Sequence, residues 1–186
     1  MTPTPALAVL LLSILVVAPA AAAAESVPDG PLPRVRMTEP GLRMLYERGL
    51  VHSPTLRALA ARLEASDVVV YLTTDPDTPS GVAGRLTFLS VVGGLRYVVV
   101  RLAPLRSAVQ QLGMIGHELQ HAVEVADRLD IVDDESLFRE YMRIGYLSGL
   151  TARGTVVDTR AASEAGWRVS QELRVWRPAM PAALLQ

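Results

Sequence analysis

The chain has 186 residues, enough for one domain with a hydrophobic core, and nothing in it indicates a second domain. A net charge of −1 without a basic cluster argues against nucleic-acid binding. The absence of cysteine excludes disulfides, thiolate metal sites and thiol catalysis. Histidine and carboxylate side chains are therefore the ligands that a zinc ion would find in this chain.

The first 24 residues predict a secretory signal peptide. An apolar run from Pro5 to Val17 is followed by a stretch of small residues that ends at Ala24. This succession is typical of a cleavable export signal. We therefore expect a periplasmic or secreted protein that begins near Glu25. The alternative is an uncleaved membrane anchor, although the apolar run is short for a membrane span.

Residues 25–40 contain four prolines and predict an extended lead-in. A short helix is expected over residues 41–48. A second helix is expected over residues 54–65, because Ser53 is a favourable N-cap and Pro54 suits the first helical position.

The middle of the chain predicts a small sheet. Residues 67–72 form a dense β-branched run that is typical of a buried strand. Residues 86–92 and 95–102 flank the pair Gly93 and Gly94, which predicts a β-hairpin with a two-residue turn. We therefore expect three strands.

Residues 116–121 read Gly-His-Glu-Leu-Gln-His and hold two of the three histidines in the chain. On a helix, positions i and i+4 lie about 40° apart around the axis and about 6 Å apart along it. His117 and His121 can therefore bind one tetrahedral zinc ion, and Glu118 can take a proton from a metal-bound water. We expect the helix that carries them to cover about residues 105–129.

The pattern around the motif supports a metal helix, because its side chains separate onto two faces. One face carries the histidines and their neighbours: Gln110, Gly113, Met114, His117, His121, Glu124 and Arg128. The opposite face is apolar: Leu105, Ala108, Leu112, Ile115, Leu119, Ala122, Val123 and Ala126. A helix that packs its apolar stripe on a sheet would leave the candidate ligands on the reverse face. Two histidines on a solvated surface are the alternative.

Further helices are expected after the motif. Asp133 or Asp134 can cap one helix, and the last helix is expected over residues 159–175. Gly149 and Gly154 mark a connection between them. The expected fold class is α+β, with the small sheet packed on the motif helix.

The motif and this order of elements resemble the zincin metallopeptidases, and the whole chain looks like small uncharacterised exported bacterial HExxH proteins. The resemblance covers about residues 66–150, and residues 116–121 are its specific part. It implies an edge strand that binds an extended peptide by main-chain hydrogen bonds, a role for which residues 96–101 are the candidate. An ordinary core or edge strand is the alternative. We expect a single zincin-like domain over residues 41–178 and a frayed tail over residues 179–186.

A catalytic zinc ion usually has three protein ligands and a water. Glu124 ranks first for the third place, since it lies on the same helix face; its alternative is to orient His121 or to pair with Arg128. Glu140 and Asp158 are further candidates, and Asp158 can instead cap the last helix. Asp127 completes a spacing similar to that of metzincins, but a continuous helix turns it about 80° away.

These features predict a small exported zinc-dependent hydrolase, and a peptidase that acts on a peptide or protein is the expected activity. Glu118 is its expected general base. Four side chains are candidates for a second donor to the developing oxyanion: His52, Tyr97, Tyr141 and Tyr146. Two alternatives remain open, an inactive metal-binding envelope protein that keeps the zincin fold, and a tethered or secreted interaction module in which the motif is incidental.

Overall fold

The computed structural model describes residues 32–78, 82–105, 107–151, 154–174 and 176. The expected signal peptide, most of the lead-in and the expected tail lie outside these residues. Residues 32–186 form one compact unit by their internal contacts. Among the described residues, no helix has the length and apolar character that a membrane span requires.

The structure is α+β, and its main sheet is mixed. The sheet has the strand order β1 (Val35–Met37), β2 (Val68–Thr74), β4 (Leu95–Leu102) and β3 (Gly84–Val92). β1 and β4 run parallel to β2, whereas β3 runs antiparallel to β4. The sheet thus has four strands where three were expected, and the strand that was not predicted is β1. A three-residue strand inside the proline-rich lead-in gives too little periodicity to be predicted.

The β3–β4 hairpin is confirmed, because Gly93 and Gly94 have φ values of 58° and 77°. Two successive positive φ angles are what a type I′ turn requires. The prediction that residues 96–101 dock an extended peptide is wrong. These residues belong to β4, which pairs with β2 on one side and β3 on the other and so has no free edge.

Helix α3 (Ala108–Ala126) packs its apolar stripe on the sheet, as its pattern predicts. The side chains of Leu112, Ile115 and Leu119 are fully buried there. Two further helices complete the N-terminal part, α1 (Pro40–His52) and α2 (Pro54–Glu64). Ser53 caps α2 by accepting a hydrogen bond from the amide of Leu56 at 3.0 Å.

A buried arginine of the sheet binds the main chain at the C-terminal end of α3. Arg96 of β4 is 2% exposed, and its guanidinium donates hydrogen bonds to the carbonyls of Val125, Arg128 and Ile131. Two further bonds of 2.7 Å reach both carboxylate oxygens of Asp67. The carbonyls at a helix C-terminus lack intrahelical partners, so this cation satisfies them and the negative end of the helix dipole together.

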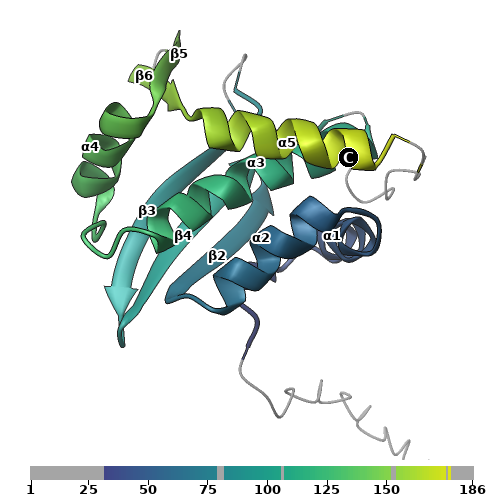
Figure 1. Ribbon diagram of the computed structural model, residues 1–186, viewed down its shortest axis with the longest axis horizontal. Coiled ribbons are helices and arrows are strands. Elements are labelled where there is room, and N and C mark those ends of the chain that lie inside the picture. Colours follow the sequence, from purple (N-terminus) through teal and green to yellow (C-terminus); the bar gives the residue numbers. More distant parts are fainter. Residues whose placement is uncertain (1–31, 79–81, 106, 152–153, 175, 177–186) are drawn as a thin grey trace, which may run out of the picture. The chain divides into compact units, whose positions relative to one another are not determined.

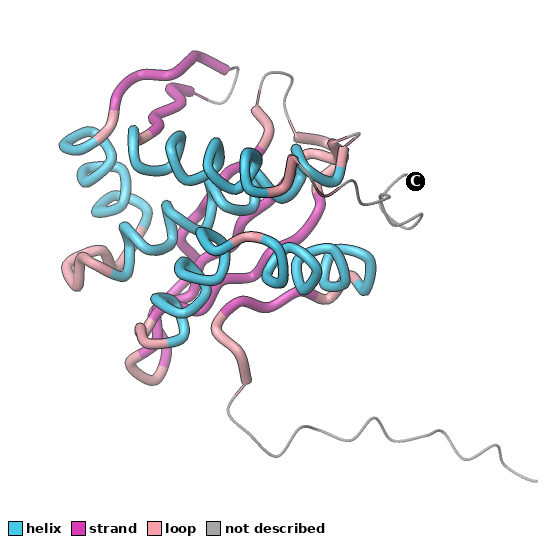
Figure 2. The backbone as a smooth tube through the Cα atoms, turned by 45° about the vertical axis from the view of Figure 1, so that its right-hand side comes forward, coloured by secondary structure: helices cyan, strands magenta, loops and turns pink. Residues whose placement is uncertain are grey.

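The last part of the chain brings a β-hairpin and a helix to α3. After α4 (Asp134–Ile144), which Asp133 caps, β5 (Tyr146–Thr151) and β6 (Gly154–Asp158) form a two-stranded sheet of their own, visible in Figure 2. The connection that Gly149 and Gly154 were expected to mark is therefore this hairpin. β6 leads directly into α5 (Arg160–Glu172), which packs along α3 (Figure 1).

Candidate metal centre

The motif segment of α3 lies between α5 and β3. On one side, a Cβ built on Gly166 of α5 would lie 3.1 Å from the Cβ of His117. On the other side, a Cβ built on Gly84 of β3 would overlap the carboxylate of Glu118. Close approach of both neighbours to α3 thus requires glycine at these two positions.

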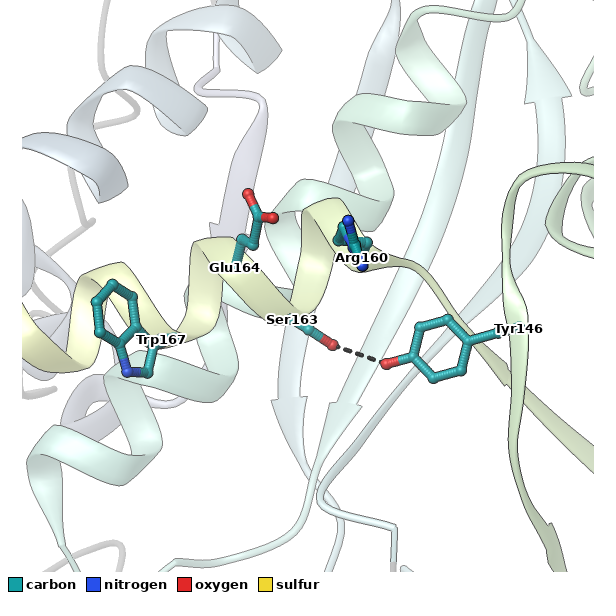
Figure 3. Close-up of a pocket in the computed structure, with 5 residues that line it drawn as sticks. All are labelled: Tyr146, Arg160, Ser163, Glu164 and Trp167. Carbon is teal, nitrogen blue, oxygen red and sulfur yellow. Dashed lines mark hydrogen bonds between the residues drawn. The ribbon is translucent and has the colours of Figure 1, made fainter.

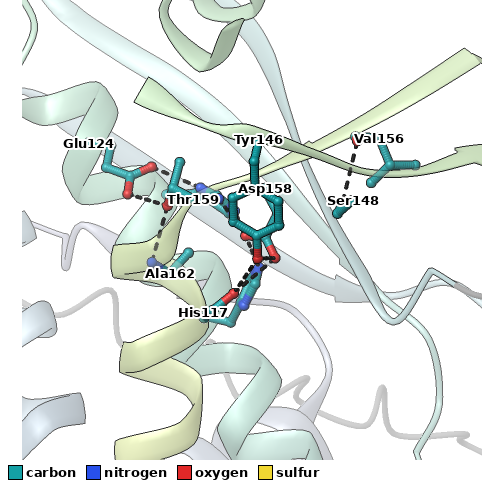
Figure 4. Close-up of polar contacts among 10 residues, drawn as sticks. His117, Glu124, Tyr146, Ser148, Val156, Asp158, Thr159 and Ala162 are labelled. Carbon is teal, nitrogen blue, oxygen red and sulfur yellow. Dashed lines mark hydrogen bonds and ion pairs between the residues drawn. The ribbon is translucent and has the colours of Figure 1, made fainter. Parts of the chain in front are cut away.

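Asp158, at the end of β6, completes a cluster with both histidines (Figure 4). Its Oδ1 atom lies 3.3 Å from Nε2 of His117 and 3.6 Å from Nε2 of His121. One ligand atom from each residue falls within 4.8 Å of the others. A tetrahedral ion with bonds of about 2.1 Å keeps its ligand atoms about 3.4 Å apart. Two imidazoles and a carboxylate at these separations could hold a metal ion.

Glu124, ranked first as the third ligand, lies on the other side of His121. Its Oε2 atom is 2.9 Å from Nδ1 of His121, the nitrogen that faces away from Asp158, and its Oε1 accepts a hydrogen bond of 2.6 Å from Thr159. This position corresponds to the alternative role of Glu124. A carboxylate that accepts the Nδ1 proton leaves the Nε2 lone pair available to a cation.

The junction between β6 and α5 determines where the Asp158 carboxylate points. Thr159 is the N-cap of α5 and accepts a hydrogen bond of 3.1 Å from the amide of Ala162. Asp158 is thus not the cap residue. Its Oδ2 accepts hydrogen bonds from Ser163 at 3.0 Å and from Tyr146 at 3.3 Å. Its Oδ1 accepts a hydrogen bond from the amide of Thr159 at 2.6 Å and faces the histidines.

Glu118 is 3% exposed, and its Oε2 atom has no hydrogen-bond partner among the described residues. Burial raises the pKa of its carboxyl to about 7, against the opposing charge of His121. A carboxylate that titrates near neutral pH can both accept and return a proton.

Three carboxylates surround the imidazole pair and concentrate negative charge there. Burial opposes ionisation of His121, but hydrogen bonds with Asp158 and Glu124 outweigh it and raise its pKa to about 10. Burial, followed by the charge of His121, lowers the pKa of His117. A site of this kind favours a bound cation.

Two of the four candidate oxyanion donors lie in the site. The ring of Tyr141 is 5.0 Å from that of His121, centroid to centroid, and its hydroxyl is buried without a hydrogen-bond partner among the described residues. Burial, reinforced by Glu124 and other nearby carboxylates, raises the pKa of Tyr141 well above its usual value, so the hydroxyl remains a donor. The hydroxyl of Tyr146 is already bonded to Asp158.

The other two candidates lie elsewhere. Tyr97 stacks on Tyr71, with ring centroids 6.4 Å apart, and alternation along β4 puts it on the face opposite α3. His52, at the end of α1, stacks on Trp176 at 4.6 Å. Both side chains therefore pack against other aromatic rings, away from the metal cluster.

The remaining acidic candidates are paired with arginines. Glu140 lies 2.5 Å from Arg143 and 3.9 Å from Arg128. Asp127 ends α3 and lies 2.7 Å from Arg62. Neither belongs to the His–His–Asp cluster.

Sequence reasoning missed three residues of this site, Gly84, Thr159 and Ser163. Thr159 had a usable signal, since a threonine that precedes a helix is a good N-cap. Gly84 and Ser163 had none, because their contacts depend on how separate elements pack.

No family model, no curated protein and no solved structure matches this chain.

Proposed function

We propose that this protein is a zinc-dependent peptidase with a zincin-like fold, in which His117, His121 and Asp158 hold the metal and Glu118 is the general base. The observation that carries the proposal is the convergence of three ligand atoms within 4.8 Å of one another, with 3.3 Å and 3.6 Å from Asp158 to the two histidines. The buried Oε2 of Glu118, in the same helical turn, has no hydrogen-bond partner in the described part of the chain and supports the proposal.

A zinc ion held by these residues would lower the pKa of a bound water to about 7 and polarise a substrate carbonyl. Glu118 accepts the proton of the attacking water at Oε2 and passes it to the leaving amine. Glu124 orients His121 through Nδ1, and Thr159 in turn fixes Glu124.

Tyr141 supplies the second donor in this mechanism. Its protonated hydroxyl is buried close to the reacting groups and has no partner among the described residues that would have to be displaced. A hydroxyl donor fixed in a buried site stabilises the charge that develops on the carbonyl oxygen.

The free edge of β3 favours an extended peptide as the substrate. The amide of Phe88 points away from β4, because it donates to the Asp134 carboxylate at 3.1 Å. Gly84 and Leu86 have the same orientation, since main-chain groups alternate along a strand. Gly84 also lies against Glu118, so a peptide paired with this edge would pass the general base. The export-signal pattern of residues 1–24 supports action outside the cytoplasm.

The test combines zinc content with hydrolysis of a peptide library by the purified protein. We expect one zinc per chain, and hydrolysis that Glu118→Gln abolishes while zinc is retained. Asp158→Asn is expected to lose zinc, whereas the matched control Asp127→Asn, also on an aspartate but outside the cluster, keeps both zinc and activity.

Three results would contradict parts of the proposal. Full zinc binding by Asp158→Asn would exclude Asp158 as the third ligand. Equal zinc loss in Glu118→Gln would contradict the division of roles. Stoichiometric zinc without cleavage of any peptide would leave a metal-binding protein and exclude the peptidase.

A further inference from the structure

A depression on α5 is shown in Figure 3, and two of its lining residues also bind Asp158 of the metal centre. It has a volume of about 570 Å³ and is lined by Tyr146, Arg160, Ser163, Glu164 and Trp167. Four of these residues recur along one face of α5, and Tyr146 comes from the start of β5. None of them has a role in the mechanism above as metal ligand or base.

The depression and the metal centre share a wall. Tyr146 and Ser163 are 3.1 Å apart at their hydroxyls, and both donate to Oδ2 of Asp158. The other oxygen of that carboxylate faces the two histidines. A molecule in the depression is therefore separated from the candidate ion by a single carboxylate.

The lining favours a large apolar side chain. Trp167 is 63% exposed and Tyr146 is 48% exposed, so two aromatic rings present apolar surface to solvent here. One arginine and one glutamate on the rim give the lining no net charge. An aromatic side chain buries roughly 150–250 Å² when it is fully covered. Contact with another ring or a large aliphatic group covers most of this surface and so gives the largest gain in binding free energy.

A peptide substrate has such a group within reach. Successive Cα atoms are about 3.8 Å apart, so the residues next to the scissile bond stay close to the metal ligands. The scissile carbonyl must lie beside the His–His–Asp cluster, and two residues that line the depression, Tyr146 and Ser163, donate hydrogen bonds to Asp158. A side chain adjacent to the cleaved bond can thus enter it.

We propose that this depression is a specificity subsite that binds an aromatic or large aliphatic side chain of the substrate beside the cleaved bond. This inference rests on the proposed peptidase function. Trp167 is its main contact surface, and Tyr146 links it to the ligand Asp158.

The test compares zinc-loaded wild type with Trp167→Ala on peptide pairs that differ only by Phe or Ala at one position next to the cleaved bond. We expect wild type to prefer the Phe peptide, and Trp167→Ala to lower kcat/KM for it about 10-fold, the scale for losing one apolar contact surface. Values for the Ala peptide and zinc content should stay unchanged. Gln171→Ala, on the same helix but outside the lining, is the matched control. An equal loss on both peptides, or no preference in wild type, would overturn the subsite.

A binding measurement separates this proposal from the peptidase itself. Trp167 is one of two tryptophans in the chain, so its fluorescence reports occupancy of the depression. In the zinc-loaded Glu118→Gln protein, the Phe peptide should change the emission and the Ala peptide should not. The change should disappear in the added variant Trp167→Phe. A protein that cleaves nothing yet gives this difference would retain the subsite and lose the proposed catalysis; no difference would overturn the subsite whether or not cleavage occurs.

Discussion

Two regions along α3 bury charged groups, and they differ in how those groups are satisfied. At the C-terminal end, every nitrogen of Arg96 donates to a carbonyl or to Asp67. Beside the middle of the helix, Oε2 of Glu118 and the hydroxyl of Tyr141 from α4 are buried without partners among the described residues. Buried polar groups in proteins are nearly always paired, and the exceptions call for an explanation. Complete pairing at the C-terminal end indicates a structural role, whereas the unpaired groups agree with the proposed catalytic roles of Glu118 and Tyr141.

The largest effect on stability should come from removing Arg96, the paired group at the C-terminal end of α3. Arg96→Met leaves Asp67 without its cation and exposes the carbonyls at the end of α3 to an apolar side chain. We expect the free energy of unfolding to fall by about 3–5 kcal/mol, as for other broken buried ion pairs. Urea denaturation measures this change. Arg101→Met, on an exposed position of the same strand, is the control and should change the free energy of unfolding by less than about 0.5 kcal/mol. An equally small change for Arg96→Met would contradict the structural role of Arg96.

The next effect should fall on activity alone. Tyr141→Phe removes a hydroxyl that is unpaired within the described ranges of the chain, so stability should stay unchanged or rise slightly. The kcat for peptide hydrolysis should drop about 10²–10³-fold, the cost of losing one donor to an oxyanion. Steady-state kinetics and urea denaturation on the same preparation test both statements. A loss of stability with normal kcat would show that the Tyr141 hydroxyl has a structural role and no catalytic one.

Gly84→Ala tests the contact between β3 and the general base. The added methyl group would overlap the Glu118 carboxylate and displace it. We expect hydrolysis to fall about 10²-fold, which is typical of a small misplacement of a catalytic group. Zinc content should be normal, because neither histidine moves. Gly149→Ala, where an added Cβ meets nothing within 4 Å, is the control; equal effects of the two changes would show that the β3 contact is unimportant.

The smallest effect concerns the pH dependence of the paired region. The hydrogen bonds from Arg96 hold the pKa of Asp67 below its ordinary value of 3.8. A carboxyl group with a lowered pKa in the folded state stabilises the protein at pH values above its unfolded pKa. This stabilisation is lost as the pH falls from about 4 through the lower, folded pKa. Asp67→Asn should therefore flatten the acid limb of a stability–pH curve and leave hydrolysis at neutral pH unchanged. An identical acid limb in the variant would contradict the assignment.

Much of the fold follows from local patterns in the sequence. The two-faced helix with the motif, the Gly93–Gly94 hairpin and the Ser53 cap each depend on neighbouring residues, and all three are present. The third member of the metal cluster was harder to predict. Helical spacing alone favoured Glu124, whereas the path of β5 and β6 brings Asp158 to the histidines from another element. Distances between elements depend on packing across the whole domain, which no local pattern reports.

The position of Asp158 at the start of α5 has a consequence for assembly of the domain. An ion held by α3 and by the β6–α5 junction would cross-link two segments that are remote in the sequence. Any ligand that binds the folded state alone raises stability in proportion to the logarithm of its concentration. The supply of the metal would then govern how much of the chain stays folded and resists proteolysis, so scarcity of the ion would remove the protein as well as its proposed activity.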